Sequence, residues 1–451
     1  MTESATRRIA ELEEQGVRFV HLTMVDNAGI TRLKMIPIRR LAAVAEFGVG
    51  MSTLIGIFTI DDHAMYLPGL HGLEGPAGDF RMVPDIDAAV KLSGETGLAW
   101  APVDQIHQDG QPTSTCQRTF LRSMERAAAD RGLAFKVAFE VEFTLLPLAR
   151  PLRGWPAFSA AGLLEVEEFA TDLVTALEEQ GLHVDQIQAE AGPGQFEVAV
   201  AAAGPVAAAD RHVLLRLTIR RIAAAHGHEV SFAPAMAASE ALGNGCHIHY
   251  SVWRGEQNLF AGGDERWGVT PEGEAAVAGL LHRLHECCAI FAPSVSSYLR
   301  LQPGHWCGAY TTWGVDNREA ALRLSRGMHT RRAAGANFEV KPADGAANPY
   351  LAAGIIIAAA LAGIDADERL PPVIQADPAT LPPEALATAG ARRLPADLGE
   401  AADALAGSQF AKDTLGTEEH AAFVATRRDE WATFRDQDRA QIVAFHELRY
   451  G

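Results

Sequence analysis

The chain has 451 residues, of which 48% are hydrophobic and 21% charged, and this size predicts a large domain accompanied by at least one smaller one. The formal net charge of −18 argues against a nucleic-acid partner, because phosphate binding requires basic surface. The five cysteines include no C-x-x-C pair, which indicates reduced thiols and a cytoplasmic location.

The first segment, "MTESATRRIAELEEQG", predicts a polar amphipathic helix capped by Ser4 or Thr6, and we expect it not to be a signal peptide. Residues 17–38 then predict two strands around the turn Asp26-Asn27-Ala28-Gly29. Short segments broken by Gly and Pro continue to about residue 104. We therefore predict a small α+β domain over residues 1–104 and a larger domain over residues 105–451.

Strands and helices alternate in the larger domain up to about residue 364. Helices are predicted near residues 114–131, 166–180, 205–226 and 271–291. The longest apolar run, 350–364, is too short to span a membrane and predicts a buried helix, so no membrane partner is expected. Residues 365–396 are rich in Pro and Ala and predict a surface connection, and residues 397–449 return to amphipathic helix.

Two acids interrupt the apolar strand "AFKVAFEVEFTLL". Residues i and i+2 of a strand point to the same face, so Glu140 and Glu142 project together, opposite Val141 and Phe143. Buried like charges repel each other. The strand therefore either has one wet face at a sheet edge or holds a cation between the two acids, and by itself it leaves both readings open.

Similar pairs follow along the chain. Glu190 and Glu197 flank the turn Gly192-Pro193-Gly194, and a hairpin at this turn would bring both carboxylates to one side. In "LGNGCHIHYSVW", His247 and His249 share a strand face after a Gly-rich approach that lets backbone come close to a ligand. A lone H-x-H pair is more often structural than ligating, so this motif carries weight only with the others.

The last motif, "ANFEVKPADGAANPYL", places Glu339 and Lys341 two residues apart. Together the motifs supply five carboxylates and a histidine, a donor set that suits Mg²⁺ or Mn²⁺, and no thiolate spacing competes for zinc. Arg300, Arg318 and Arg323 add basic groups. Arginines that face carboxylate-held ions fit phosphoryl transfer, whereas without the acids these arginines would be ordinary solvated surface.

The order of the motifs resembles the type I glutamine synthetase family. The motifs are F-E-x-E-F, E-x6-E around G-P-G-Q, N-G-x-H-x-H-x-S, Y-x-R-L-x-P-G, N-R-x-x-x-x-R and E-V-x-P-x-D-x-x-A-N-P-Y-L, and they cover nearly the whole chain. The resemblance implies an α+β fold, with a small N-terminal β-grasp domain and a catalytic domain built on a curved antiparallel sheet and helices. It also implies a homo-oligomer, a dodecamer of two stacked hexameric rings with active sites between neighbouring subunits.

The resemblance also implies a role for each matching residue. One metal ion would be held by Glu142, Glu190 and Glu197, and a second, on the nucleotide phosphates, by Glu140, His247 and Glu339. The nucleotide would contact His249 and Ser251, and the transferring phosphate Arg318 and Arg323. The glutamate substrate would contact Gly243 and Arg300 beside Glu142, Glu190 and His247. The implied cofactors are two or three Mg²⁺ or Mn²⁺ ions, with ATP as co-substrate.

The implied reaction has two steps. ATP first phosphorylates a carboxylate to an acyl phosphate, and an amine then attacks the acyl phosphate to form an amide and release phosphate. Activation is needed because a free carboxylate is a poor electrophile and hydroxide a poor leaving group. If Glu140 and Glu142 bind two different cations, their mutual repulsion is removed. The resemblance therefore favours the cation reading of this strand over the wet sheet edge.

Two departures from the family concern the nucleophile. Ammonia-using members carry an Asp in G-V-G-F-D-G-S-S, where this chain has "GVGMSTLI" with Ser52. They carry a flap Glu in P-G-Y-E-A-P, where this chain has "PGHWCGAY" with Trp306. An organic amine gains apolar contact and cation–π attraction from an indole, whereas ammonium loses both anions. We therefore predict a primary organic amine larger than ammonia as the nucleophile.

Two further departures concern the acid substrate. Leu242 replaces an Asn near the glutamate loop, and Lys341 replaces an Arg, which keeps the charge but loses the bidentate fork. Glutamate is the expected acid, and a ligase for a related carboxylate is a competing hypothesis. The amine stays open between ethanolamine, a polyamine, a short alkylamine and an aromatic amine. Two more hypotheses compete with an amine ligase: a true glutamine synthetase and a non-catalytic regulatory paralogue.

Overall fold

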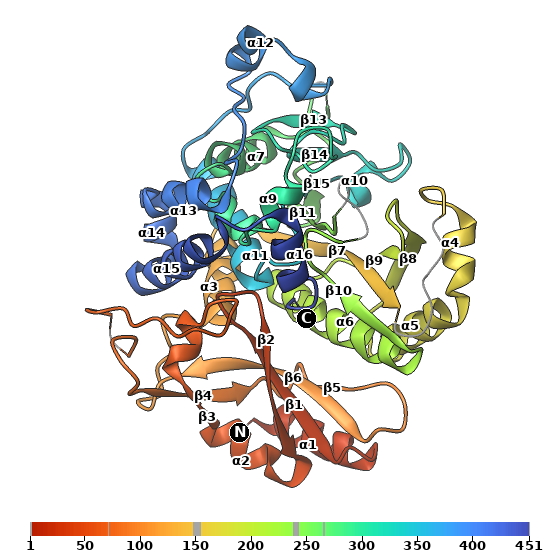
Figure 1. The fold of residues 1–451 in the computed structure, drawn as a ribbon, viewed down its shortest axis with the longest axis vertical. Helices are drawn as coiled ribbons and strands as arrows, with labels where there is room; N and C mark the ends of the chain where they lie inside the picture. The colour runs from red at the N-terminus through yellow and green to blue at the C-terminus, as the bar shows by residue number, and fades with distance from the viewer. Residues whose placement is uncertain (1, 71, 148–154, 238–242, 265–266, 451) are drawn as a thin grey trace.

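The fold is known from a computed structural model that describes residues 2–70, 72–147, 155–237, 243–264 and 267–450. These residues form two sheets: a six-stranded one near the N-terminus and a nine-stranded one that carries the remaining strands. Figure 1 shows the smaller sheet below the larger one, with the C-terminal helices to one side. This mixture of sheets and helices confirms the predicted α+β class.

The N-terminal sheet has the strand order β2-β1-β6-β4-β3, and β5 pairs with β6. Its strands are β1 (Phe19–Val25), β2 (Thr31–Pro37), β3 (Val49–Ser52), β4 (Asp79–Pro84), β5 (Val90–Lys91) and β6 (Leu98–Ile106). Strands β1 and β2 form the predicted antiparallel hairpin, whereas β1 and β6 pair in parallel. Helices α1 (Glu3–Glu14) and α2 (Leu41–Phe47) accompany the sheet. The division at residue 104 stays a prediction.

The turn of this hairpin docks into the larger part of the chain. Asn27 is buried, and its backbone oxygen accepts a hydrogen bond from Nη2 of Arg427 at 3.0 Å. Nδ2 of Asn348 donates to the backbone oxygens of Val25 and Asp26. A β-carbon placed on Gly29 would lie 2.1 Å from the backbone oxygen of Ala346. The turn therefore docks on residues 346–348 and on Arg427 of the larger part of the chain.

The larger sheet has the order β13-β14-β15-β11-β7-β9-β8, and outside this order β10 pairs with β7 and β12 with β11. Its strands are β7 (Ala134–Pro147), β8 (Val184–Ala189), β9 (Gln195–Val200), β10 (His228–Ser231), β11 (Cys246–Arg254), β12 (Gln257–Asn258), β13 (Trp313–Val315), β14 (Leu322–Ser325) and β15 (Asn337–Val340). The pairings around β7 and β11 are antiparallel. The predicted strand with two acids is thus central rather than an edge strand.

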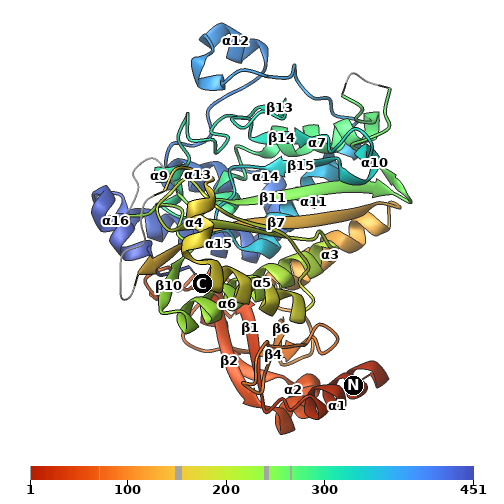
Figure 2. The same cartoon turned by 90° about the vertical axis from the view of Figure 1, so that its right-hand side faces the viewer.

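Apolar residues of β7 face helices, and this orientation sends the acids to the opposite face. Phe139 lies 4.7 Å from the ring of His212 on α6 (Pro205–Ala225), and Phe143 packs edge-to-face on Phe169 of α5 (Glu167–Glu179). Figure 2 shows α5, α6 and α3 (Gln117–Ala129) on the side of the sheet that faces the N-terminal part. Strand alternation therefore fixes which face can bind ligands.

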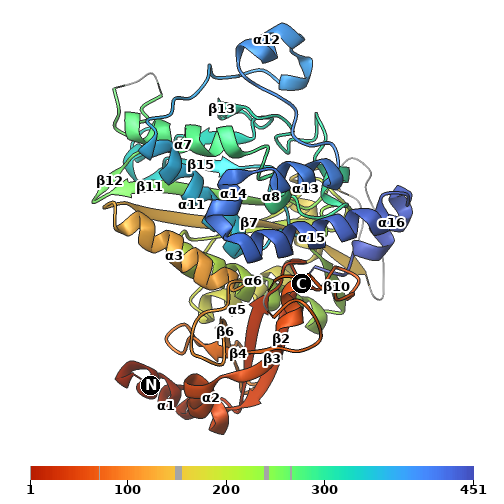
Figure 3. The same cartoon turned by 90° about the vertical axis from the view of Figure 1, so that its left-hand side faces the viewer.

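The remaining helices cover the sheet and form the C-terminal part. They are α4 (Ala160–Glu165), α7 (Pro271–Arg283), α8 (Cys288–Phe291), α9 (Ser297–Arg300), α10 (Arg332–Gly335), α11 (Pro349–Asp365), α12 (Pro383–Thr388), α13 (Leu398–Ala406), α14 (Gln409–Leu415), α15 (Thr417–Phe434) and α16 (Arg439–His446), with short 3₁₀ turns at Ile38–Arg40, Thr53–Ile57 and Pro378–Thr380. Figure 3 shows α13 to α16 on the flank of the large sheet. Among the described helices, none is long and apolar enough to cross a membrane.

Candidate active site

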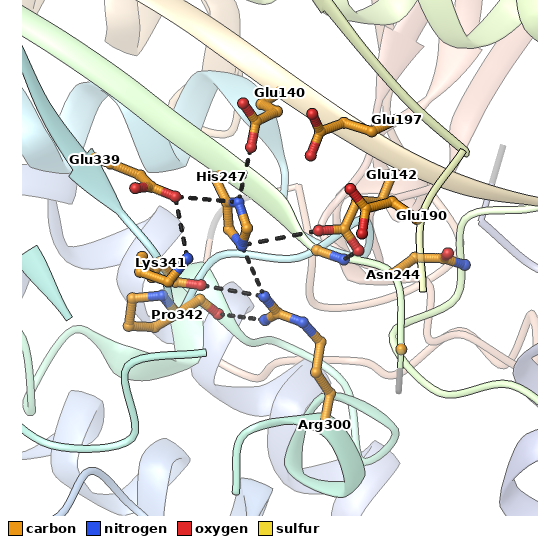
Figure 4. Close-up of polar contacts among 12 residues, drawn as sticks. Glu140, Glu142, Glu190, Glu197, Asn244, His247, Arg300, Glu339, Lys341 and Pro342 are labelled. Atoms are coloured by element: carbon orange, nitrogen blue, oxygen red, sulfur yellow. Dashed lines mark hydrogen bonds and ion pairs between the residues drawn. The ribbon is translucent and has the colours of Figure 1, made fainter. Parts of the chain in front are cut away.

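Strand register places the predicted site residues directly opposite one another. Glu142 on β7 faces Glu197 on β9, and Glu140 faces His247 on β11. On the next strands, Glu339 is the cross-strand partner of both His249 and Arg323. Figure 4 shows the carboxylates converging on His247 from several strands. The structure therefore gathers residues that lie up to 199 positions apart, Glu140 to Glu339, on one face of the sheet.

The first acidic group consists of Glu142, Glu190 and Glu197. Burial, reinforced by the charge of Glu142, raises the pKa of Glu190 to about 7. Burial and the charges of Glu140, Glu142 and Glu190 also raise the pKa of Glu197. Glu197 is buried, and its carboxylate accepts hydrogen bonds from side-chain amides of β8, which carry no charge. This group therefore has the negative charge that a cation site requires.

The second group consists of Glu140, His247 and Glu339. Nδ1 of His247 lies 3.1 Å from Oε1 of Glu140 and 3.2 Å from Oε1 of Glu339. Burial opposes ionisation of Glu140, but the hydrogen bond and charge of His247 lower its pKa. Burial also opposes ionisation of Glu339, which is 1% exposed, but the charges of Lys341 and His247 hold its pKa well below the usual range.

These donors fit divalent ions. Ligand atoms of Glu140, His249 and Glu339 lie within 4.8 Å of one another. Nε2 of His249 is buried and has no hydrogen-bond partner among the described residues. A ring nitrogen in this state can serve as a metal ligand. The resemblance assigned His247 to this ion and His249 to the nucleotide, whereas this geometry groups His249 with the two acids. Both rings border the same space, and the choice between them stays a prediction.

Basic groups flank the second group. Nη1 of Arg323 donates to Glu339 at 2.6 Å, and Nζ of Lys341 donates to the other oxygen of Glu339 at 3.1 Å. Nη2 of Arg300 lies 3.2 Å from Nε2 of His247, and Arg300 is buried. Arg318 is exposed and lies beside the indole of Trp306. Arg300 and Arg323 therefore join the site through side-chain contacts, whereas the role of Arg318 on the transferring phosphate stays a prediction.

Residues 243–245 approach β7 closely. A β-carbon on Gly243 would lie 1.7 Å from the backbone oxygen of Pro234, so this position admits no side chain. The backbone N–H of Gly245 donates to Oε2 of Glu142 at 2.9 Å. Leu242, which precedes this turn, lies outside the described residues. Ser251 is buried on the same strand as His249, and its Oγ accepts a hydrogen bond from Trp253.

Ser52 and Trp306, the two positions expected to differ from ammonia-using relatives, lie in different parts of the structure. Trp306 lies in the loop after α9 and is 53% exposed. Ser52 ends β3 of the N-terminal sheet, where its Oγ accepts from the N–H of Leu54. In Figure 1, β3 lies well below β7 and β9, and Figure 3 shows the same separation between β3 and β7. The structure of one chain therefore does not bring Ser52 to the carboxylates.

Amide side chains that the sequence motifs did not single out also contact the acids. On β8, Gln186 and Gln188 each donate to Oε1 of Glu197 at 3.1 Å, and Gln188 also donates to Glu190 at 2.8 Å. Gln195 donates to Oε2 of Glu142 at 2.9 Å. The alternation Q-x-Q-x-E at residues 186–190 was the signal available, because a strand places all three side chains on one face. These amides orient the first acidic group.

Comparison with known proteins identifies the family. The family description "Glutamine synthetase, catalytic domain" matches residues 114–445. The chain is 44% identical to the gamma-glutamylpolyamine synthetase GlnA3 of Streptomyces coelicolor, over 99% of this chain and 97% of that protein. It is 30% identical to the glutamine synthetase of Thermotoga maritima, over 96% of this chain and 97% of that one.

Solved structures agree with this assignment. A crystal structure described as a novel glutamine synthase homolog matches with a TM-score of 0.84 at 30% identity, covering 96% of this chain and 98% of that one. A GmaS/ADP complex matches with a TM-score of 0.82 at 27% identity and 98% coverage of both chains. On the motifs, the fold and these matches, the chain belongs to the glutamine synthetase family.

Proposed function

We propose that this protein is an ATP-dependent ligase that joins the γ-carboxylate of glutamate to a primary organic amine, with polyamines as the amine class. The observation that carries the proposal is a selective loss. The strand residues assigned to metal and phosphate share one sheet face, whereas the positions that hold anions in ammonia-using relatives are here Ser52 and Trp306. The full-length similarity to a gamma-glutamylpolyamine synthetase supports the choice of polyamines.

The proposed mechanism assigns the two acidic groups to two or three Mg²⁺ or Mn²⁺ ions, which when bound would offset the negative charge of the ATP phosphates. His249 and Ser251 contact the nucleotide. Arg318 and Arg323 stabilise the charge that develops on the transferring phosphoryl group. The amine then attacks the acyl phosphate, and phosphate leaves as the amide forms.

The glutamate end of the site is assigned to Gly243, Arg300 and Lys341. The close backbone approach at Gly243 and the buried guanidinium of Arg300 suit a small anionic substrate. Lys341 offers a point charge rather than the bidentate guanidinium of an arginine, and its Nζ donates a hydrogen bond to Glu339. Glutamate therefore remains the acid in this proposal.

The apolar part of the amine supplies the preference over ammonia. Burying one CH₂ group contributes about 0.8 kcal/mol, so two or three methylenes against Trp306 would favour an organic amine by roughly 10- to 100-fold. Ammonium offers no methylene and finds no carboxylate at Ser52 or Trp306. The substitutions at Ser52 and Trp306 therefore both favour an organic amine over ammonia.

The proposed assembly is a dodecamer of two hexameric rings that works in the cytoplasm. Ser52 lies in the N-terminal sheet, away from the carboxylates of its own chain, so a neighbouring subunit would bring its β3 to the site. The five cysteines are buried free thiols, which suits a reducing compartment.

Product analysis tests the proposed function. Purified protein is incubated with ATP, Mg²⁺, glutamate and one of ammonium, ethanolamine, butylamine or 1,4-diaminobutane, and the products are identified by mass spectrometry. We expect a γ-glutamylamide of the diamine, with one phosphate released per amide and no product when ATP or glutamate is omitted. Absence of any amide across this panel would contradict the proposal.

A further inference from the structure

Trp306 adopts a backbone conformation that its own side chain does not explain. Its φ is 55°, in the left-handed region, which costs a non-glycine residue roughly 1–2 kcal/mol. The indole is 53% exposed, so burial of the ring offsets little of this cost. Contacts made by other residues must therefore fix this conformation.

Glu319 makes such a contact. Its side chain is largely buried, with 9% of the residue exposed, and Oε1 accepts a hydrogen bond from the backbone N–H of Trp306 at 3.0 Å. The backbone of Gly304 also donates to this carboxylate. The backbone N–H of Glu319 is itself bonded to Oδ1 of Asn317 at 3.0 Å, and Nδ2 of Asn317 donates to Ile374. The carboxylate is thus anchored on a framework outside the loop.

Arg318, the residue before Glu319, contacts the ring of Trp306. The guanidinium carbon of Arg318 lies 5.9 Å from the centroid of the Trp306 ring, within cation–π range. Two consecutive residues therefore contact Trp306, one at the ring and one at the backbone. If Arg318 meets the transferring phosphate as proposed, this contact would bring the indole beside that end of the site.

The loop is also fixed at Cys307, the residue that follows Trp306. Cys307 is fully buried, and its thiol donates to the backbone oxygen of Gln302. Burial raises the pKa of this thiol, and the charges of Arg300, Glu319 and Lys341 act on it. The residue that follows Trp306 is therefore anchored in the interior, while the indole of Trp306 itself is 53% exposed.

We propose that Glu319 is a positioning residue that fixes Trp306 as a wall of the amine pocket, and this inference rests on the proposed function. Contact between an indole and methylene groups falls off within a fraction of an ångström, so an exposed tryptophan needs a rigid backbone to contribute to binding. Ammonia makes no such contact. Glu319 therefore governs specificity for organic amines without touching the amine itself.

A double-mutant cycle tests this role. Glu319→Ala, Trp306→Ala and the double variant are assayed by phosphate release with 1,4-diaminobutane, ammonium and glutamate as varied substrates. We expect Glu319→Ala to raise the KM for the diamine by about tenfold, the equivalent of one or two lost methylene contacts, and to leave the KM for glutamate within about twofold. In the Trp306→Ala background, Glu319→Ala should have no further effect on the diamine.

Two conservative variants separate the hydrogen bond from the charge. Glu319→Gln keeps an acceptor at the same reach and should retain most of the diamine activity. Glu319→Asp keeps the charge but is too short to reach Trp306, and it should behave like Glu319→Ala. Glu274→Ala is the matched control, because it removes a carboxylate that accepts a backbone N–H, that of Leu370 at 3.1 Å, from a helix away from the loop. This control should leave every KM unchanged.

Two results would overturn the inference while leaving the proposed function intact: additive effects of Glu319→Ala and Trp306→Ala, or wild-type behaviour of Glu319→Asp. If instead wild-type protein forms no amide with any organic amine, the proposed function itself is wrong. Thermal midpoints of all variants, measured in parallel, show whether a raised KM accompanies loss of the fold. An equal rise in the KM of glutamate and diamine at an unchanged midpoint would also contradict a role through Trp306.

Discussion

Glu140 and Glu142 stand two positions apart on β7, yet their cross-strand neighbours give them opposite surroundings. Glu140 faces His247, whose hydrogen bond and charge favour the ionised acid. Glu142 faces another acid, Glu197, whose pKa is raised by burial and by its acidic neighbours. The group around Glu197 therefore depends on a cation more strongly than the group around His247.

Replacement of Glu197 by Gln tests this dependence. The change removes one negative ligand and keeps the shape, so we expect turnover to fall by at least about 100-fold and Mn²⁺ to bind more weakly. Isothermal titration calorimetry with Mn²⁺ in the absence of nucleotide measures the second effect directly. Glu178→Gln, at an exposed carboxylate of α5, is the control and should change neither quantity. Unaltered Mn²⁺ affinity in Glu197→Gln would remove Glu197 from the metal site.

The raised pKa of Glu190, about 7, gives the site a pH signature. An unfolded glutamate loses its proton near pH 4.5, so between about pH 5 and 7 the metal-free folded state holds more protons, and its stability falls as pH rises. Bound metal replaces the proton, so the rise in thermal midpoint caused by Mg²⁺ should be larger at pH 8 than at pH 6.

Differential scanning fluorimetry with and without Mg²⁺ at both pH values measures this difference. Glu190→Gln lacks the titrating group, so its Mg²⁺-dependent rise should differ less between the two pH values. An equal Mg²⁺ effect at pH 6 and pH 8 in the wild-type protein would show that Glu190 does not compete with protons for metal.

Single-residue patterns predicted much of the candidate site because strand alternation is local. Glu140 and Glu142, or His247 and His249, share a face wherever the strand goes. The cross-strand partners of those residues depend on register, which the local pattern does not contain. For this reason the hydrogen bonds from Gln186 and Gln188 to Glu197, and the contact between Arg323 and Glu339, emerged only from the structure.

At the scale of elements, the β1–β2 hairpin was predicted and its docking was not. The turn residues Asp26 to Gly29 specify a tight reversal, and the structure confirms it. A turn with these residues would ordinarily be exposed, but Asp26 and Asn27 are buried, and they accept hydrogen bonds from Asn348, Gln117 and Arg427 of the helical part. The apolar pattern also predicted one helix over 271–291, which is wrong: α7 ends at Arg283 and α8 begins at Cys288. Burial continues through Leu284, Cys287 and Cys288, so the pattern carries no sign of the break.

Two glycines with the same backbone conformation test the docking of the hairpin. Gly29 has φ +77° and Gly16 has φ +79°, but a β-carbon at Gly16 meets nothing within 4 Å. Gly16→Ala should therefore cost only the left-handed strain, roughly 1–2 kcal/mol. Gly29→Ala must also displace the backbone of Ala346, so its cost should be at least twice as large. Urea-unfolding midpoints compare the two variants, and equal shifts would mean that the turn does not pack as described.

At the scale of the whole molecule, the motif order predicted the family, and the comparisons confirm it. The oligomeric state stays a prediction. It would explain how Ser52 reaches the carboxylates, because the two lie in separate sheets of one chain. A dodecamer of 48.3 kDa chains would have a mass of about 580 kDa, twelve times the chain mass. Light scattering after size-exclusion chromatography should give this mass, and a stable monomer with full activity would contradict an active site shared between subunits.

The ratio of kcat/KM for 1,4-diaminobutane to that for ammonium, measured by phosphate release with glutamate and ATP, tests the central claim most directly. We expect this ratio to exceed one by roughly 10- to 100-fold in the wild-type protein, because methylene burial favours the diamine and no carboxylate stands at Ser52 or Trp306. Trp306→Glu should move the ratio toward ammonium, since it restores an anion that stabilises the cation and accepts its proton. A wild-type ratio below one for this and every other organic amine tried would show that the nucleophile is ammonia and that the protein is a glutamine synthetase with an altered loop.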